Sequence, residues 1–322
     1  MRQRKLSGLR AQAFEHPLDS RALNALKNTA GFDKLLAKVN EWSVERLLRV
    51  QLTGSYLRVT ADNFPEVHET LTRACDILDI ASAPELYIAA GGGINAFTAG
   101  TTRPLIVVNS SAIDGLDDAE LLFVIAHELG HIMCGHVLYY QIAEFLPMIA
   151  KVIGSATFGL GEVVALGVQA ALLHWRRMSE LSCDRAGLLA CQDANAAITA
   201  MMKIAGLPQK YYDRINPEDF INQAKAFQEM ESDRLTRYAK YVTTIGSTHP
   251  WTVARAQQFL NWVDNGEYER VLSEPQKVPI ALPAGVKSYC IQCGGALNGA
   301  EVFCPSCGDR LSSDHPSRAG CA

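Results

Sequence analysis

Two histidines and a glutamate occupy a five-residue segment inside an apolar stretch, and their spacing indicates the clearest chemistry in the sequence. The segment reads HELGH over residues 127–131. Residues four apart share one helical face, with β-carbons about 5–6 Å apart, so His127 and His131 can both bind one zinc ion at about 2.0–2.1 Å. Glu128 is near enough to take a proton from water on that metal. The alternative is a chance pair of structural histidines flanking a glutamate.

The longer form of this motif, which supplies its third histidine from the same segment, is absent. Cys134 stands where that pattern requires glycine, and Val137 stands where it requires histidine. His136 is off register by one residue. The third zinc ligand must therefore come from elsewhere in the chain, and glutamate is the expected type.

Three downstream glutamates are candidates for the third ligand, namely Glu144, Glu162 and Glu180. Only Glu180 is followed four residues later by an aspartate, Asp184, within the segment SELSCDRAG. On a helix these two side chains share a face, so one can bind zinc while the other orients a ligand histidine. A solvated acidic face would also explain the pair, but the flanking leucines favour a buried helix. We therefore predict Glu180 as the third ligand.

The two motifs together, HELGH and SELSCDRAG about fifty residues later, resemble the HtpX and CAAX-prenyl-protease family of gluzincin metallopeptidases. Three further segments follow in the family's order: INAFTAG from residue 94, PLIVVN from residue 104, and STHP from residue 247 with Arg255 after it. The resemblance covers roughly residues 62–265. It implies a mostly helical α+β zincin-type metallopeptidase domain with a small sheet.

The resemblance also implies roles for residues that the spacing alone does not decide. Within it, His249 helps to stabilise the transition state, and Asp184 and Arg255 support the zinc site. His249 could equally cap a helix that starts near Pro250. The segment around Asn95, Ala96 and Phe97 is expected to be an edge strand that pairs with an extended peptide substrate.

The predicted function is therefore a zinc-dependent endopeptidase that acts on polypeptides, and by resemblance on unfolded or damaged proteins. The competing hypothesis is a latent or non-catalytic adaptor that keeps the peptidase fold and binds a partner. An intact Glu128 argues against the adaptor, because such a scaffold needs the zinc ligands but not the base. An enzyme with one dedicated substrate is a third hypothesis.

A second metal site is predicted near the C-terminus. Cys290 and Cys293 form one C-x-x-C knuckle, Cys304 and Cys307 form another, and each knuckle is followed by glycine. Four thiolates at this spacing are typical of a zinc ribbon, in which a structural zinc supplies the folding energy of a segment too small for a core. Disulfides are the rival interpretation. We expect a protein partner at the ribbon.

Composition and charge narrow the class of protein further. The net charge is −4, so no overall basic field invites nucleic acid. Nine cysteines, an odd number, without an apolar export signal favour a reducing cytoplasm. Residues 138–175 are strongly apolar, but charged residues interrupt them before they reach the roughly 18–20 residues that span a bilayer. A buried helical hairpin is the favoured interpretation, and peripheral membrane association through these residues is the alternative.

The expected organisation has five parts. Residues 1–60 form an N-terminal helical segment, 61–270 the peptidase domain, 271–287 a proline-rich linker, 288–311 the ribbon and 312–322 a polar tail. Asp19 and Ser20 are candidate caps of the first helix, and a second helix is expected from Pro65 to Leu78. Strands are expected over residues 85–90 and 105–108, and helices from His131 to about residue 265.

Overall fold

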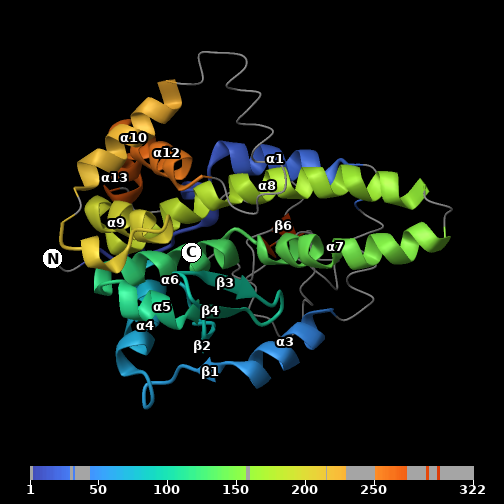
Figure 1. Cartoon of the computed structure of the whole chain (residues 1–322), viewed down its shortest axis with the longest axis horizontal. Helices are drawn as coiled ribbons and strands as arrows, with labels where there is room; N and C mark the ends of the chain where they lie inside the picture. Colours follow the sequence, from blue (N-terminus) through green and yellow to red (C-terminus); the bar gives the residue numbers. More distant parts are fainter. Residues whose placement is uncertain are drawn as a thin grey trace.

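The protein is a helical body built around one small sheet (Figure 1). The computed structural model describes residues 3–29, 32, 44–156, 160–214, 216–229, 251–273, 288–289 and 296–297. The helices are α1 (Pro17–Lys27), α3 (Val44–Ser55), α4 (Pro65–Ile77), α5 (Ser110–Gly115), α6 (Asp118–Met133), α7 (Val137–Ala156), α8 (Leu160–Cys191), α9 (Ala194–Ile204), α10 (Pro217–Glu229), α12 (Thr252–Asp264) and α13 (Glu267–Ser273). The strands are β1 (Leu57–Arg58), β2 (Glu85–Ala89), β3 (Ala96–Ala99), β4 (Leu105–Asn109), β5 (Ser288–Tyr289) and β6 (Ala296–Leu297).

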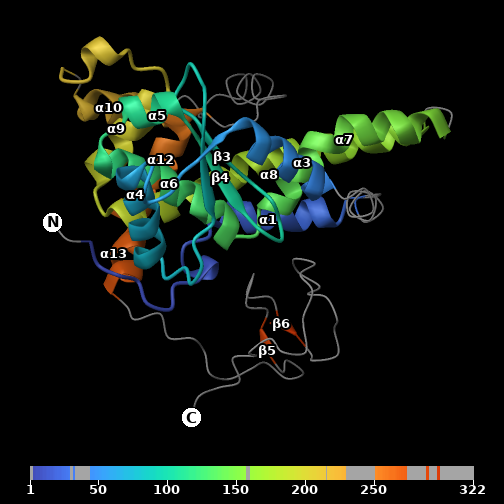
Figure 2. The same cartoon turned by 90° about the horizontal axis from the view of Figure 1, so that it is seen from below.

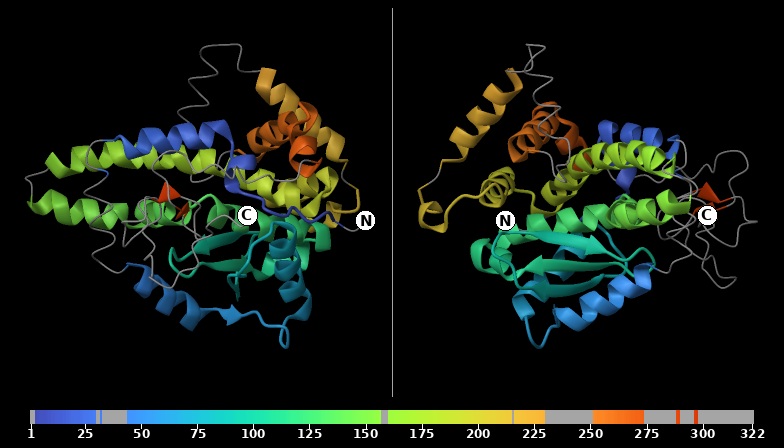
Figure 3. Two further views of the ribbon diagram at one scale, coloured as in Figure 1. Left: turned by 180° about the vertical axis from the view of Figure 1, so that it is seen from behind. Right: turned by 45° about the vertical axis from the view of Figure 1, so that its right-hand side comes forward.

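The first four strands form one sheet in the order β1-β2-β4-β3. The central strands β2 and β4 are parallel and almost wholly buried, as their runs of apolar residues predict. β3 pairs antiparallel with β4 and forms an edge of the sheet, which confirms the expected edge strand. Helix α6 lies against one face of this sheet, with α8 on the far side of α6 (Figure 3).

Helix α6 begins at a capping box. The Asp117 carboxylate accepts hydrogen bonds from the amides of Ala119 and Glu120, and the Glu120 carboxylate accepts one from the amide of Asp117. Every residue from Glu120 to His131 is buried, so α6 is the core helix of the molecule. It ends at Cys134, and Gly135 then turns the chain with a φ of +70°, a conformation that favours glycine.

Helices α7 and α8 form the expected hairpin, which extends away from the sheet, with α1 packed along α8 (Figures 1 and 2). This hairpin has its own apolar cluster, which includes Leu26, Phe32, Leu172 and Trp175. Among the described residues, no single helix is long and apolar enough to cross a membrane; α6 and the first half of α7 reach that length and hydropathy only together, across an 87° bend.

The described residues of the N-terminal part form two helices, α1 and α3, and the chain enters β1 at Leu57. The prediction of the cap of the first helix is wrong. Asp19 and Ser20 do not cap α1, which begins at Pro17 with His16 as its cap. The reason is that Nδ1 of His16 already accepts a hydrogen bond from the amide of Leu18. The Asp19 carboxylate is fully buried and accepts hydrogen bonds from two side chains of α8.

The predicted ribbon is described only at its two short strands, which pair antiparallel as Ser288–Leu297 and Tyr289–Ala296. Its four cysteines, Cys290, Cys293, Cys304 and Cys307, lie outside the described residues, as do most of the linker and the tail.

Candidate metal centre

Two helices that cross in the core bring the predicted metal ligands together. Helix α6 presents His127 and His131 on one buried face, and α8 presents Glu180, which is 1% exposed. Nε2 of His127 lies 3.5 Å from one carboxylate oxygen of Glu180, and Nε2 of His131 lies 3.6 Å from the other. Ligand atoms held about 2.0–2.1 Å from a tetrahedral zinc ion stand roughly 3.4 Å apart, so the donor set and spacing fit zinc.

The orientation of His127 is fixed from behind by Asp184. Nδ1 of His127 lies 3.1 Å from Oδ1 of Asp184, which leaves Nε2 to face Glu180. Burial lowers the pKa of His127, but hydrogen bonds and charge from Asp184 and Glu180 outweigh burial and raise that pKa to about 9. Because the same negative charge attracts a proton or a metal cation, this is a place in the core where a cation is stabilised.

Asp184 is in turn held by Arg255 of α12. The guanidinium donates two hydrogen bonds to the Asp184 carboxylate, at 2.9 Å from Nε and 2.5 Å from a terminal nitrogen. Burial raises the pKa of Asp184, yet the charge and hydrogen bonds of Arg255, with those of His127, bring it below its ordinary value. Another nitrogen of Arg255 lies 3.2 Å from Glu180. Arg255 therefore balances the charge of two buried carboxylates.

The second histidine has different neighbours. Nδ1 of His131 lies 3.1 Å from Nδ1 of His136, which follows the turn after α6. The Tyr140 ring packs edge-on against the His131 ring, with centroids 4.9 Å apart. Its hydroxyl donates a hydrogen bond of 2.7 Å to the Glu180 oxygen nearest His131.

Glu128 lies on the side of α6 that faces the sheet edge. The hydroxyl of Thr98, in β3, donates a hydrogen bond of 2.7 Å to its carboxylate. The strand expected to bind substrate thus contacts the residue expected to act as base. Asn95 is exposed, and Ala96 and Phe97 are half-buried and pair with β4.

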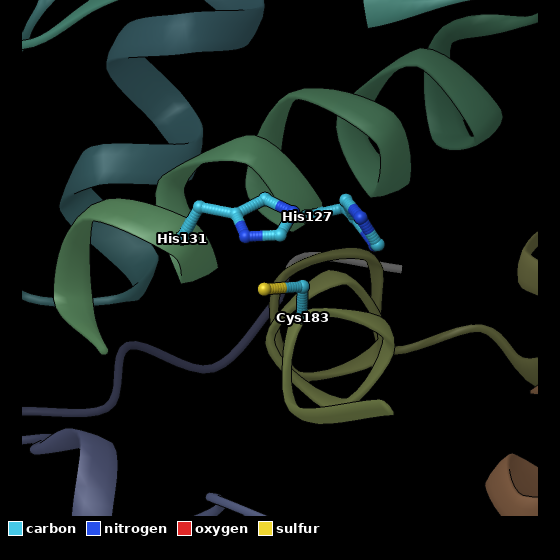
Figure 4. Close-up of side chains that lie close together, drawn as sticks. All are labelled: His127, His131 and Cys183. Atoms are coloured by element: carbon cyan, nitrogen blue, oxygen red, sulfur yellow. The ribbon is translucent and has the colours of Figure 1, made fainter. Parts of the chain in front are cut away.

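Cys183 is a rival third ligand, because its sulfur lies within 4.8 Å of a nitrogen of each histidine (Figure 4). However, its sulfur is also 3.6 Å from Nδ1 of His136, which contacts Nδ1 of His131. It therefore lies toward the Nδ1 side of His131, away from the Nε2 atom that faces Glu180. We favour Glu180, since its two oxygens face the Nε2 atoms of both histidines.

The close crossing of α6 and α8 depends on small residues. A β-carbon added to Gly130 would stand 2.9 Å from Cβ of Ala186 and 3.1 Å from Cα of Cys183. Glycine at this position, between the two histidines, lets the helices approach closely enough for Glu180 to reach both imidazoles.

The structure thus brings together six predicted residues: His127, Glu128, His131, Glu180, Asp184 and Arg255. Of the rejected candidates, Glu144 is exposed, and the side chain of Glu162 lies outside the described residues. The predicted catalytic residue His249 also lies outside the described residues.

Four other residues at the site were not predicted to bind the metal or to take part in catalysis: Thr98, His136, Tyr140 and Asp19, the last of which lies 2.9 Å from His136. From its spacing in the sequence, His136 is assessed only as a zinc ligand. Its position five residues after His131, within apolar sequence, could have indicated a buried polar contact. Nothing in the sequence near Asp19 indicates that it reaches the site.

Comparison with known proteins decides the family. The model of peptidase family M48 matches residues 61–263. The chain belongs to peptidase family M48. This confirms the predicted HtpX-like relationship, and peptidases of this family are zinc-dependent, in accord with the donor set described above.

Relatives of this M48 peptidase come from plants, archaea and bacteria. The plastoglobule-localized metallopeptidase 48 of Arabidopsis thaliana is 31% identical over 271 residues, which cover 84% of this chain and 77% of the relative. A protease HtpX homolog of Methanosarcina acetivorans is 30% identical, and one of Streptomyces coelicolor is 28% identical. These alignments cover 52% and 51% of this chain, and 62% and 61% of the relatives. No solved structure matches the chain at a comparable level.

Proposed function

We propose that this M48 peptidase is a zinc-dependent endopeptidase with His127, His131 and Glu180 as zinc ligands and Glu128 as general base. The observation that carries the proposal is the pair of 3.5 and 3.6 Å separations between the histidine Nε2 atoms and the two Glu180 oxygens. Each ligand is also held from behind, by Asp184, His136 or Tyr140. Such outer contacts set ligand orientation and metal affinity.

Three protein ligands leave one position of a tetrahedral zinc for water, which is the mark of a catalytic site. Zinc bound there would lower the pKa of that water and polarise the substrate carbonyl. Glu128 would accept the proton and pass it to the leaving amine, as a general base and then a general acid. The hydroxyl of Thr98 keeps the Glu128 carboxylate in place for both steps.

An extended peptide would bind by adding a strand at the outer edge of β3, beside Asn95, Ala96 and Phe97. No strand pairs with that edge among the residues that the structure describes. Because Thr98 of the same strand contacts Glu128, a peptide paired there would pass next to the metal ligands. Binding through main-chain hydrogen bonds suits unfolded or damaged proteins of varied sequence, which we propose as the substrates.

His249 remains our proposal for a group that stabilises the oxyanion of the transition state. It precedes α12, whose residue Arg255 is buried against Asp184 and Glu180. This contact supports the proposal because it anchors the start of α12 on the side of the metal ligands.

We also propose a structural zinc at Cys290, Cys293, Cys304 and Cys307. In its support, β5 pairs antiparallel with β6, and Cys290 and Cys293 fall between these two strands in the sequence. Metal analysis should find two zinc ions per chain, and one when Cys290 and Cys293 are both replaced by serine. A single zinc ion that the double replacement leaves unchanged would remove the ribbon from the proposal. A protein partner at the ribbon, a cytoplasmic location and membrane contact through residues 138–175 stay predictions.

The decisive experiment compares casein cleavage by zinc-loaded wild type, Glu128→Gln and a matched control, Glu144→Gln. Glu144 is exposed on α7, so its replacement should leave activity unchanged. Wild type and the control should cleave, Glu128→Gln should bind zinc without cleaving, and a chelator should stop all cleavage. Cleavage by Glu128→Gln at the wild-type rate would contradict the role of the base. If no variant cleaves, the adaptor with a bound partner becomes the better hypothesis.

The choice of third ligand has its own test. Glu180→Ala should lose the catalytic zinc, while Glu144→Ala and Glu162→Ala should keep it. If Glu180→Ala retains the metal and Cys183→Ala loses it, the thiol rather than the carboxylate is the ligand.

A further inference from the structure

A line of buried polar groups runs from the second histidine of the metal centre to the N-terminal helix. Nδ1 of His131 is 3.1 Å from Nδ1 of His136, and Nε2 of His136 is 2.9 Å from Oδ2 of Asp19. The second contact is at ion-pair distance, and Nε2 of His136 makes no hydrogen bond with another group among the described residues. Asp19 and His136 are both 0% exposed. Both groups are therefore shielded from bulk water.

The direction of the hydrogen bonds along this line follows from the chemistry of its ends. A neutral imidazole that binds a metal through Nε2 carries its proton on Nδ1, so His131 must donate to His136. Nδ1 of His136 must then be an acceptor, which puts its proton on Nε2, facing Asp19. A carboxylate only accepts hydrogen bonds, so it stabilises that arrangement. If His136 donated to His131 instead, the proton of His131 would sit on Nε2, and Nε2 could not bind a metal.

Asp19 is itself held in place by two fixed donors from α8. The indole Nε1 of Trp175 donates to Oδ1 at 3.0 Å, and the hydroxyl of Ser182 donates to Oδ2 at 2.6 Å. Burial raises the pKa of Asp19, but its interactions with His136 and the hydrogen bonds from Ser182 and Trp175 together bring that pKa below its ordinary value. Asp19 is therefore a carboxylate that accepts hydrogen bonds from Trp175 and Ser182 and faces Nε2 of His136.

We propose that Asp19, acting through His136, is a positioning residue that keeps Nε2 of His131 free for the metal. The inference rests on the proposed zinc ligands. It extends the site to α1, which lies outside the part of the chain matched by the family model, residues 61–263. The N-terminal helix is thus part of the catalytic apparatus as well as a packing element on α8.

The substitution Asp19→Asn tests the positioning role of Asp19, because the indole of Trp175 determines the orientation of the asparagine side-chain amide. An indole N–H can only donate, so the amide oxygen must face Trp175 and the amide NH₂ must face His136. His136 would then have to accept at Nε2 and donate from Nδ1, which reverses the whole line. A comparable loss of tautomer control is known to be severe in serine proteases.

The measurement is the zinc dissociation constant of the full-length protein, by competition with a chromophoric chelator, together with the unfolding temperature of the metal-free protein. Asp19→Asn should weaken zinc binding about 10–100-fold, the usual effect of losing an outer contact. The matched control is Leu26→Ala, which loosens the same helix at a fully buried apolar position without touching the line. It should lower the unfolding temperature and leave zinc affinity unchanged.

A double variant separates positioning from packing. In Asp19→Asn with Trp175→Phe, the indole donor is gone and the amide can turn its oxygen to His136. Zinc affinity should therefore recover towards the wild-type value, although two core residues are changed. A further loss on adding Trp175→Phe would overturn the proposal, as would wild-type zinc affinity in Asp19→Asn alone.

If Asp19→Asn does not fold, a second pair of variants decides. His136→Asn keeps an acceptor beside His131 and should bind zinc more tightly than His136→Leu, which does not; equal affinities would overturn the proposal. Failure of the proposed zinc ligands themselves would look different, since wild type would then lack the catalytic zinc, or Glu180→Ala would still bind the catalytic zinc.

Discussion

The substitution Gly130→Ala probes how closely the two ligand-bearing helices must approach. The added methyl group would stand 2.9 Å from Cβ of Ala186, whereas carbon atoms in good contact are about 3.5–4.0 Å apart. The opposing atoms belong to or adjoin the α8 backbone, so no flexible side chain can move away. The helices must therefore separate locally by about 0.6 Å, which exceeds the tolerance of about 0.2 Å in metal–ligand distances.

The energetic cost follows from two opposing effects. Overpacking a core costs about 1–3 kcal/mol, whereas alanine in place of glycine within a helix gains about 1 kcal/mol. Gly130→Ala should therefore lower the free energy of unfolding by about 0–2 kcal/mol. Gly167→Ala is the matched control, because Gly167 is exposed in α8 with no atom near its added β-carbon. It should gain stability, so the difference between the two variants isolates the packing cost.

The assay is chemical denaturation of both metal-free variants, followed by zinc titration. Zinc should bind about tenfold or more weakly to Gly130→Ala, because His131 and Glu180 are moved apart. Gly167→Ala should bind zinc like wild type. If Gly130→Ala matches Gly167→Ala in stability and wild type in zinc affinity, the close crossing does not set the ligand geometry.

Three further predictions concern the base, the helix cap and a buried ion pair. Thr98→Val removes the donor to the Glu128 carboxylate, so kcat should fall about tenfold or more while zinc content is unchanged, as steady-state kinetics and metal analysis can show. Burial lowers the pKa of His16 to about 4 from 6.5, so the unfolded chain binds more protons between these values. The free energy of unfolding should therefore be fully retained above pH 6.5 and fall as pH drops towards 4, in denaturation curves taken across that range. Lys203→Met leaves the charge of Glu120, 1% exposed, without its 2.6 Å partner and should cost about 3–5 kcal/mol in the same assay.

Each of these has a control within the chain. Thr98→Ser keeps the hydroxyl and should keep kcat, so equal losses in the two variants would contradict the hydrogen-bond argument. His16→Asn keeps a capping acceptor but does not titrate, and an unchanged pH dependence in that variant would assign the effect elsewhere. Adding Glu120→Gln to Lys203→Met should restore much of the lost stability, because glutamine can complete the capping box without a charge. No recovery would show that the loss was not electrostatic.

Much of the site was predictable from sequence because its parts are local. The HELGH motif and the pair Glu180 and Asp184 each depend on residues within four positions of one another, and helical periodicity decides which of them share a face. The strands β2 and β4 were predictable for the same reason, since a short apolar run describes a buried strand. The sequence by itself therefore determined the HELGH motif, the family and the central strands of the sheet.

The tertiary structure alone decided which distant groups support that motif. Local rules predict Asp19 as a helix cap, but it lies inside the core because α1 packs on α8, where Trp175 and Ser182 donate hydrogen bonds to its carboxylate. His136, Thr98 and Tyr140 likewise gain their roles from contacts 5 to 40 residues away in the chain. The periodicity of apolar residues predicts which face of its own helix or strand a side chain lies on. What that side chain meets depends on how the elements pack, and here it depends on the close crossing of α6 and α8 at Gly130.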